Sequence, residues 1–125
     1  MFIRHYTKVP GVKHQPTNPG VSLRTVISTA DGAANFVMRV AQVAPGSSSA
    51  LHRHDYEHEV FILSGKGALV QGKKRSPLKA GDVVYLAPNE EHAFAGTGER
   101  PLRLICCIPV CEASAHETGG CMVQG

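Results

Sequence analysis

Three histidines fall within seven residues of this chain, and this cluster constrains fold and function more than any other stretch. His52 and His54 are two residues apart, and His58 follows four residues later, at the start of an apolar run. Residues two apart on a strand point to the same face, so His52 and His54 can address one point. A fold-back at the polar corner 55–57 brings His58 to that point. Neutral imidazole suits several divalent metals, so the stretch predicts a metal site.

Glycines frame this histidine cluster at regular distances. Five residues separate Gly46 from His52, and six residues separate His58 from Gly65. Fifteen residues separate Gly65 from a second block, GDVVYLAPNEEH, which ends at His92. This frame favours the interpretation of these histidines as metal ligands over their interpretation as ordinary solvated loop residues.

The frame resembles the cupin superfamily. The first cupin motif is a Gly, five residues, HxH, three or four residues, Glu, six residues and Gly. The second motif is a Gly, a short apolar strand, a Pro and a His, which are matched here by Gly81, residues 83–86, Pro88 and His92. The match departs from the pattern at Glu90 and Gly96, where many cupins have Gly and Asn.

The closest resemblance is to small single-domain bacterial cupins of the type-2 conserved-barrel kind, in which the fourth ligand is another His. It extends from about Gly20 to Val110. It implies an all-β fold, a double-sheet jelly-roll β-barrel, with a divalent metal ion inside. The resemblance also implies the ligand set, which is His52, His54, His58 and His92, with Glu59 as the alternative to His58.

The pattern of short apolar runs predicts an all-β chain without reference to any family. No window of a dozen residues keeps the 3.6-residue period of a helix, whereas Gly and Pro turns separate about ten strand-length runs. Such a pattern is typical of a β-sandwich or barrel. The strands are predicted at 3–7, 21–28, 35–43, 51–53, 58–64, 67–71, 76–78, 82–86, 92–95 and 102–108.

The chain divides into three parts in this interpretation. Residues 1–20 form a first strand and a Pro-rich connector, and three prolines and two glycines within 8–20 predict irregular structure there. Residues 21–110 form the barrel. Residues 111–125 form a Gly-containing tail in which Cys111 and Cys121 flank His116 without CxxC spacing, so a flexible tail is favoured over a second metal site.

Charge and composition exclude several classes of function. The 13 Lys and Arg against 10 Asp and Glu give a net charge of only +3, and the single basic run, 73–75, follows Gly72 as in a solvated turn. A nucleic-acid surface is therefore not predicted. The N-terminus has no apolar core of a signal peptide and no run is long enough to span a membrane, so we expect a cytoplasmic protein with reduced cysteines.

The fourth ligand decides the charge of the predicted site. His58 and Glu59 are adjacent, so on a strand only one of them faces inward, and the spacing to Gly65 favours His58. Four neutral imidazoles leave the full charge of a divalent ion such as Mn, Fe, Ni or Zn, which attracts anions to open positions. We therefore expect a small anionic ligand, such as a carboxylate, a 2-keto acid or a diketonate.

Two functions remain open at this point. The first is a metal-dependent enzyme, an oxygenase or isomerase-type catalyst, with Glu57 and Tyr56 as candidate catalytic residues and Arg39 as a further candidate for anion steering. The second is a protein that binds or senses a small ligand through the metal without turnover. A serine hydrolase elbow and a phosphate-binding loop are both absent from the sequence. Because barrel edges need covering, we also expect a homodimer.

Overall fold

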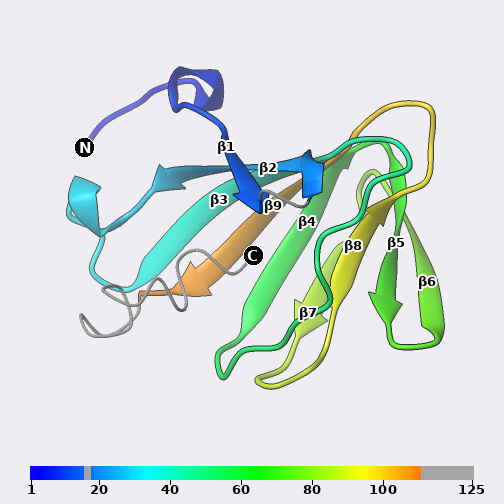
Figure 1. The fold of residues 1–125 in the computed structure, drawn as a ribbon. Coiled ribbons are helices and arrows are strands. Elements are labelled where there is room, and N and C mark those ends of the chain that lie inside the picture. The colour runs from blue at the N-terminus through cyan, green and yellow to red at the C-terminus, as the bar shows by residue number, and fades with distance from the viewer. Residues whose placement is uncertain (16–17, 111–125) are drawn as a thin grey trace.

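The computed structural model describes residues 1–15 and 18–110 as two antiparallel β-sheets with two short 3-10 helices (Figure 1). The helices are η1 (Tyr6–Lys8) and η2 (Thr29–Asp31). The six-stranded sheet contains, in spatial order, β1 (Val12–Gln15), β2 (Asn18–Ile27), β3 (Phe36–Val43), β9 (Leu102–Pro109), β4 (His58–Ser64) and β7 (Val83–Leu86). The three-stranded sheet contains, in spatial order, β6 (Lys74–Lys79), β5 (Lys66–Gln71) and β8 (Ala93–Gly96).

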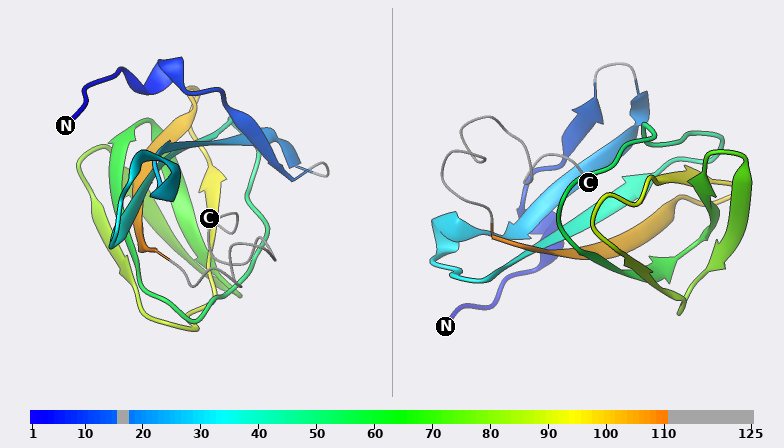
Figure 2. Two further views of the ribbon diagram at one scale, coloured as in Figure 1. Left: turned by 90° about the vertical axis from the view of Figure 1, so that its left-hand side faces the viewer. Right: turned by 90° about the horizontal axis from the view of Figure 1, so that it is seen from below.

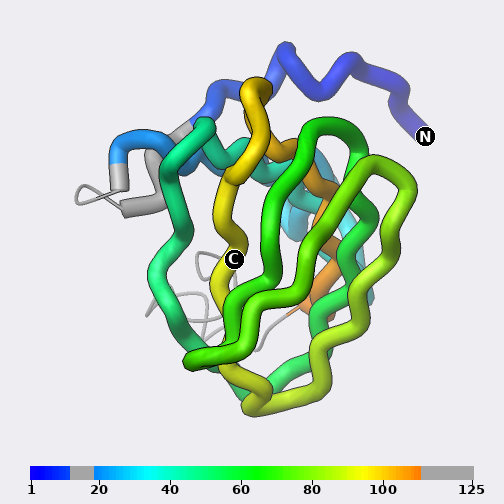
Figure 3. The backbone as a smooth tube through the Cα atoms, turned by 90° about the vertical axis from the view of Figure 1, so that its right-hand side faces the viewer, coloured from blue at the N-terminus to red at the C-terminus, as the bar shows by residue number. Residues whose placement is uncertain are grey.

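The two sheets face each other and form a jelly-roll β-barrel, as predicted. Seen from the side in Figure 3, the strands of the smaller sheet lie in front of the larger one, and the end-on view in Figure 2 shows the barrel outline. The hydrophobic core lies between the sheets and includes Val43, Ile62, Leu69, Leu86, Phe94, Leu102 and Leu104. None of the helices among residues 1–15 and 18–110 has the length and hydropathy to span a membrane.

Strict alternation in the central strands decides which side chains enter the barrel. In β4 the residues His58, Val60 and Ile62 are buried, whereas the residues between them are exposed. Strand β9 alternates between buried and half-buried residues over its whole length. The register places Cys106 of β9 beside Val60 on one side and Arg39 of β3 on the other, so these three residues share the inner face.

Gly65 joins the two sheets because it ends β4 and immediately precedes β5. Its φ of 83° lies in the left-handed region that favours glycine, and a Cβ there would collide with the carbonyl oxygen of Pro101. The conformation and the close approach explain why a glycine stands at this place in the frame around the histidines.

Most of the predicted strands are present, but the prediction for the N-terminus was wrong. Residues 3–7 do not form a strand, since the backbone turns into η1, where the Lys8 amide donates to the His5 carbonyl at 3.0 Å. The connector over 8–20 is not irregular throughout, because β1 lies within it and β2 begins there. Pro10 precedes β1, and Pro19 lies at the start of β2, where a proline is compatible with a strand.

One further strand prediction differs from the structure. The predicted strand at 51–53 is reduced to one isolated bridge between His52 and His92. Of the basic run 73–75, Lys73 lies in the tight turn between β5 and β6, as expected, whereas Lys74 and Arg75 begin β6; all three are exposed. The tail with Cys111, His116 and Cys121 lies outside the described residues.

The alternation in β4 yields a direct test of the barrel core. Ile62 is completely buried, whereas its neighbour Leu63 points outward and is 40% exposed. We expect Ile62→Ala to lower the free energy of unfolding by about 2–5 kcal/mol, since it removes apolar contacts and leaves a cavity. The matched control, Leu63→Ala, should cost about 1 kcal/mol or less. Urea unfolding measures both, and equal losses would contradict the assigned inner face.

Candidate metal centre

A short antiparallel pairing brings His52 and His92 together although forty residues separate them in the sequence. The His52 amide donates to the His92 carbonyl at 3.1 Å, and the His92 amide donates to the His52 carbonyl at 2.9 Å. The same alignment continues along β8, where the Ser49 amide donates to the Phe94 carbonyl and the Ser49 hydroxyl accepts from the Phe94 amide, both at 2.9 Å. These bonds hold the segment before β4 against the smaller sheet.

His58 is the first residue of β4 and faces the barrel interior. It is 0% exposed, whereas Glu59 lies on the opposite face and is exposed. The strand pairing fixes this choice, since Glu59 pairs with Cys107 and Tyr85 on the outer face. Of the two residues between which the cupin spacing was ambiguous, the structure brings His58 to the cluster and turns Glu59 away from it.

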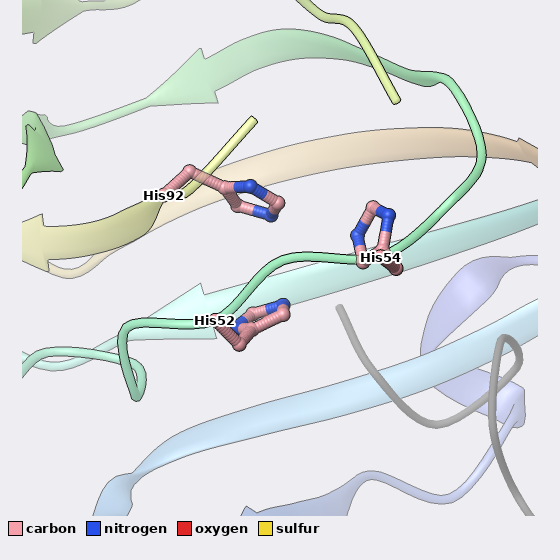
Figure 4. A group of neighbouring side chains, drawn as sticks. All are labelled: His52, His54 and His92. Atoms are coloured by element: carbon pink, nitrogen blue, oxygen red, sulfur yellow. The ribbon is translucent and has the colours of Figure 1, made fainter. Parts of the chain in front are cut away.

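Three histidines of the centre converge closely, and His58 lies beside them (Figure 4 shows the three). One ring nitrogen of each of His52, His54 and His92 lies within 4.8 Å of the others, a spacing at which they could hold a metal ion. The His58 ring centroid is 5.4 Å from the His54 ring and 5.4 Å from the His92 ring. His58 is therefore adjacent to the group without belonging to its tightest part.

Backbone carbonyls orient the three converging rings. Nδ1 of His52 donates to the Ala50 carbonyl at 2.7 Å, and Nδ1 of His92 donates to the Glu90 carbonyl at 2.8 Å. Nδ1 of His54 donates to the Tyr56 carbonyl at 3.3 Å. A hydrogen bond from Nδ1 leaves Nε2 with its lone pair available to a metal, which is how protein groups commonly orient metal-ligating histidines.

The nitrogens that remain fit a metal ion. Nε2 of His54, Nε2 of His92 and both ring nitrogens of His58 are buried and have no hydrogen-bond partner among the described residues. Buried polar atoms are normally paired, because each unpaired one costs free energy. An ion bound by these nitrogens would satisfy them, and a set of imidazoles matches the preferences of Zn, Cu, Fe and Ni better than those of Ca or Mg.

Burial keeps these imidazoles neutral. Removal from water lowers the pKa of His54 from 6.5 to about 4, with the neighbouring His92 as the second cause. Removal from water, followed by the positive charge of Arg39, lowers the pKa of His58 to about 2. Burial also lowers the pKa of His92. The neutral form is the one that binds a metal, so these rings need not lose a proton at pH 7.

The turn before His92 contains Glu90, at a position where many cupins have a Gly. The Glu90 carboxylate accepts from the Ala87 amide at 3.0 Å, and Asn89 adopts a left-handed φ of 66°. The Gln71 side chain donates to Glu90 at 3.1 Å and so ties this turn to β5. Glu90 thus closes the turn that positions His92, which accounts for a Glu where many cupins have a Gly.

The two candidate catalytic residues lie in different surroundings. The Tyr56 ring stacks on the His54 ring at 3.9 Å between centroids, and burial raises the pKa of its hydroxyl to about 12. Glu57 is exposed and accepts a hydrogen bond from the Tyr85 hydroxyl at 2.7 Å. Tyr85 lies on the outer face of β7. The structure therefore brings Tyr56, and not Glu57, to the histidine cluster.

Arg39 is a charged residue in the interior, in addition to the neutral histidines. Its side chain is 0% exposed, and the other buried polar or charged residues of the described chain are His54, His58 and His92. The sequence marked Arg39 only as one of several candidates for steering anions. The burial of a permanent cation beside four histidines depends on strand register, which a sequence pattern does not reveal.

The barrel and the histidine cluster together define a class of small double-sheet β-barrels with a cluster of histidines that could hold a metal ion. Comparison with known families narrows it further, since the cupin domain family matches residues 39–108. The chain therefore belongs to the cupin family. The predicted family and fold are confirmed, and the histidine cluster is compatible with a divalent metal ion.

Several characterised proteins are similar to this chain. The oxalate-binding protein of Thermotoga maritima is 38% identical over 68 residues, which are 54% of this chain and 56% of that protein. The L-ectoine synthase of Bordetella parapertussis is 27% identical over 96% of this chain and 93% of the enzyme. In the first relatives that match, the alignment spans only about half of the relative's length.

Among solved structures, the polyketide cyclase RemF of Streptomyces resistomycificus is similar over 90% of this chain and 80% of the cyclase. The TM-score is 0.81 and the identity is 29%. The similarity thus extends well beyond the segment that carries the cupin motifs.

The lowered histidine pKa values predict a loss of stability in mild acid. Below about pH 6.5 the unfolded chain gains protons on these imidazoles, while folded His54 stays neutral until about pH 4. The free energy of unfolding of the metal-free protein should therefore fall from pH 6.5 to pH 5, by up to about 1.4 kcal/mol per pH unit for each such histidine. Above pH 6.5 these histidines should add no further dependence of the free energy of unfolding on pH.

Urea unfolding at several pH values measures this slope. His54→Asn should reduce it, whereas His5→Asn, which changes an exposed histidine outside the barrel, should leave it unchanged. A slope that is the same in the wild type and in His54→Asn would contradict the neutral, buried state of His54.

Proposed function

We propose that this chain binds one divalent metal ion through His52, His54, His58 and His92, and that the ion binds a small carboxylate or dicarbonyl compound. One observation carries the proposal: buried imidazole nitrogens without partners converge in the barrel interior from three separate segments. A cluster that served packing alone would be expected to pair these nitrogens with protein groups.

The donor set supports an anionic ligand. The four proposed ligands are neutral and therefore offset none of the charge of a divalent ion, which the apolar surroundings of the barrel strengthen. When bound, such an ion would supply Lewis-acid or redox chemistry to a ligand that occupies its open positions. The protein's own contribution is to hold the rings through the carbonyls of Ala50, Tyr56 and Glu90 and to exclude water from the interior.

A metal-dependent enzyme is the first candidate function. Two of the similar proteins that align with nine tenths or more of this chain are named as a synthase and a cyclase, and both names denote enzymes. An oxygenase or isomerase-type reaction on a small oxygenated acid suits this centre. Tyr56 is a candidate proton-handling residue that stacks on His54 of the cluster, and burial, which raises its pKa to about 12, keeps its hydroxyl protonated at neutral pH and makes it a weak proton donor.

Binding or sensing without turnover is the second candidate. The exposed position of Glu57 and Glu59 favours it, because neither carboxylate faces the interior, where a general base would be needed. The oxalate-binding protein of Thermotoga maritima provides a parallel by name. A screen of small organic acids and diketones on the metal-loaded protein separates the two candidates: product or O2 consumption indicates the enzyme, and binding without either indicates the binder.

The proposed ligand set predicts unequal effects of two adjacent substitutions. His58→Asn removes a proposed ligand and should weaken metal binding by one to two orders of magnitude or more, roughly the scale that even outer-shell losses reach. Glu59→Gln is the matched control on the opposite face of β4 and should change the affinity by no more than about 10-fold. Elemental analysis after loading with Mn, Fe, Ni or Zn gives the stoichiometry, and competition with a chelator gives the affinity.

Circular dichroism shows whether each variant keeps the β-fold. The reverse ranking in two folded variants would assign the fourth position to Glu59. Absence of stoichiometric metal from the wild type after loading with all four metals would contradict the proposal itself.

We also propose that two copies of the chain associate through the outer face of β4 and β7. Phe61, Val83 and Tyr85 are exposed on this face, and Val83 is 74% exposed. They line a groove of about 370 Å³ together with Ile105 and Cys107. Strand β7 is an edge of the six-stranded sheet, so two identical copies can pair along it across a twofold axis.

The oligomeric state tests this surface. Light scattering should give the mass of a dimer for the wild type at micromolar concentration and a monomer for Val83→Glu, which places a charge in the apolar patch. Phe36→Glu changes an equally exposed apolar residue on β3, away from the groove, and should remain a dimer. A monomeric wild type would contradict the proposal.

A further inference from the structure

The turn between β7 and β8 contacts two of the proposed metal ligands. This turn, residues 87–91, contains Asn89, whose backbone amide donates to the His54 carbonyl at 2.6 Å. The next residue, Glu90, accepts from Nδ1 of His92 through its own carbonyl at 2.8 Å. Two consecutive residues of one turn therefore hold the backbone of one proposed ligand and the ring of another.

His54 depends on this turn more than the other proposed ligands do. His52 and His92 hold each other through a pair of backbone hydrogen bonds, and His58 belongs to β4. His54 lies in neither a strand nor that bridge. Within residues 1–15 and 18–110, the backbone hydrogen bond that fixes His54 is the one from the Asn89 amide.

The Asn89 backbone has an uncommon conformation that directs this amide. Its φ is 66°, and every other residue with a positive φ in the described part of the chain is a glycine. A Cβ is disfavoured in this left-handed region, which asparagine tolerates better than most residues and which β-branched residues tolerate least. Such a conformation persists only where the surrounding structure requires it, and here it lies one hydrogen bond from the histidine centre.

Groups other than the Asn89 side chain hold the shape of the turn. The Glu90 amide donates to the Ala87 carbonyl at 3.1 Å, and the Glu90 carboxylate accepts from the Ala87 amide at 3.0 Å and from Gln71 at 3.1 Å. The Asn89 side chain itself is exposed. The contribution of Asn89 to the centre is therefore its backbone conformation.

We propose that Asn89 is a positioning residue of the metal centre, because its left-handed backbone holds His54 at the distance from His92 that one ion requires. The two rings approach each other from separate segments, with centroids 5.0 Å apart and planes inclined by 74° (Figure 4). Metal–imidazole bonds are short, about 2.0–2.1 Å for zinc, so a small displacement of one ring weakens the site. This inference rests on the proposed function and adds the element that sets the geometry of that site.

Titration of the full-length chain with Co²⁺ tests the assignment. Asn89→Val makes the left-handed backbone unfavourable and should weaken Co²⁺ binding by about 10-fold or more, the scale for loss of a group that orients a metal ligand. Asn89→Gly keeps this conformation accessible and should bind Co²⁺ within about 3-fold of the wild type. The visible absorption bands of bound Co²⁺ report the coordination geometry. They should change in Asn89→Val and stay the same in Asn89→Gly.

The matched control is Gly32→Val. Gly32 ends η2 with a φ of 91°, and a Cβ there would meet no atom within 4 Å. The variant introduces comparable backbone strain away from the proposed ligands. It should lower the free energy of unfolding of the metal-free chain, as Asn89→Val does, but leave the Co²⁺ affinity and spectrum unchanged. If Asn89→Val does not fold, the comparison of Asn89→Ala with Asn89→Gly decides, since alanine has a Cβ without a branch.

Two results would overturn the inference. Wild-type affinity and spectrum in folded Asn89→Val would show that this turn does not set the geometry of the centre. Equal weakening in Asn89→Gly and Asn89→Val would show that the centre uses the side-chain amide and not the backbone. A wild-type chain that binds no Co²⁺ would contradict the proposed function, which is a different outcome from a chain that binds Co²⁺ regardless of the substitution.

Discussion

The burial of three imidazoles, those of His54, His58 and His92, in a small β-barrel is the constraint on which the rest of this structure depends. Buried polar atoms without partners cost free energy, and a chain of 125 residues has a limited core to offset that cost. The histidines are kept neutral by burial, which removes part of the cost. The nitrogens that remain without partners are those of a site that a metal ion would complete.

Much of this arrangement could be predicted from the sequence because it is local. The spacing of His52 and His54 and the frame of Gly46 and Gly65 lie within one stretch, and a glycine with positive φ at the end of β4 has a clear signature. The choice of His58 over Glu59 also followed from strand alternation together with one spacing. The placement of these two residues on opposite faces is confirmed.

What could not be predicted depends on pairings between distant segments. The burial of Arg39 follows from its register with Cys106, sixty-seven residues later in the chain, and no local pattern encodes that register. The strand prediction for the N-terminus failed for a related reason. The segment 3–7, in which apolar and basic residues alternate, is too short to form a strand without a partner, and the backbone closes into η1 instead. The orienting role of the Ala50 and Glu90 carbonyls likewise depends on backbone geometry and not on residue type.

This chain is similar to proteins with very different functions: a binding protein, a synthase and a cyclase. The fold therefore does not decide the reaction, and the residues of the centre must. In this chain a cluster of histidines faces the barrel interior, whereas Glu57 and Glu59 are exposed.

The most direct measurement is anomalous diffraction from crystals of the metal-loaded chain at the absorption edge of the metal. The account predicts a single strong anomalous peak inside the barrel, at about 2.0–2.2 Å from one ring nitrogen of each of His52, His54, His58 and His92. A peak bound by the other three histidines while His58 stays out of contact, or a peak outside the barrel, would contradict it.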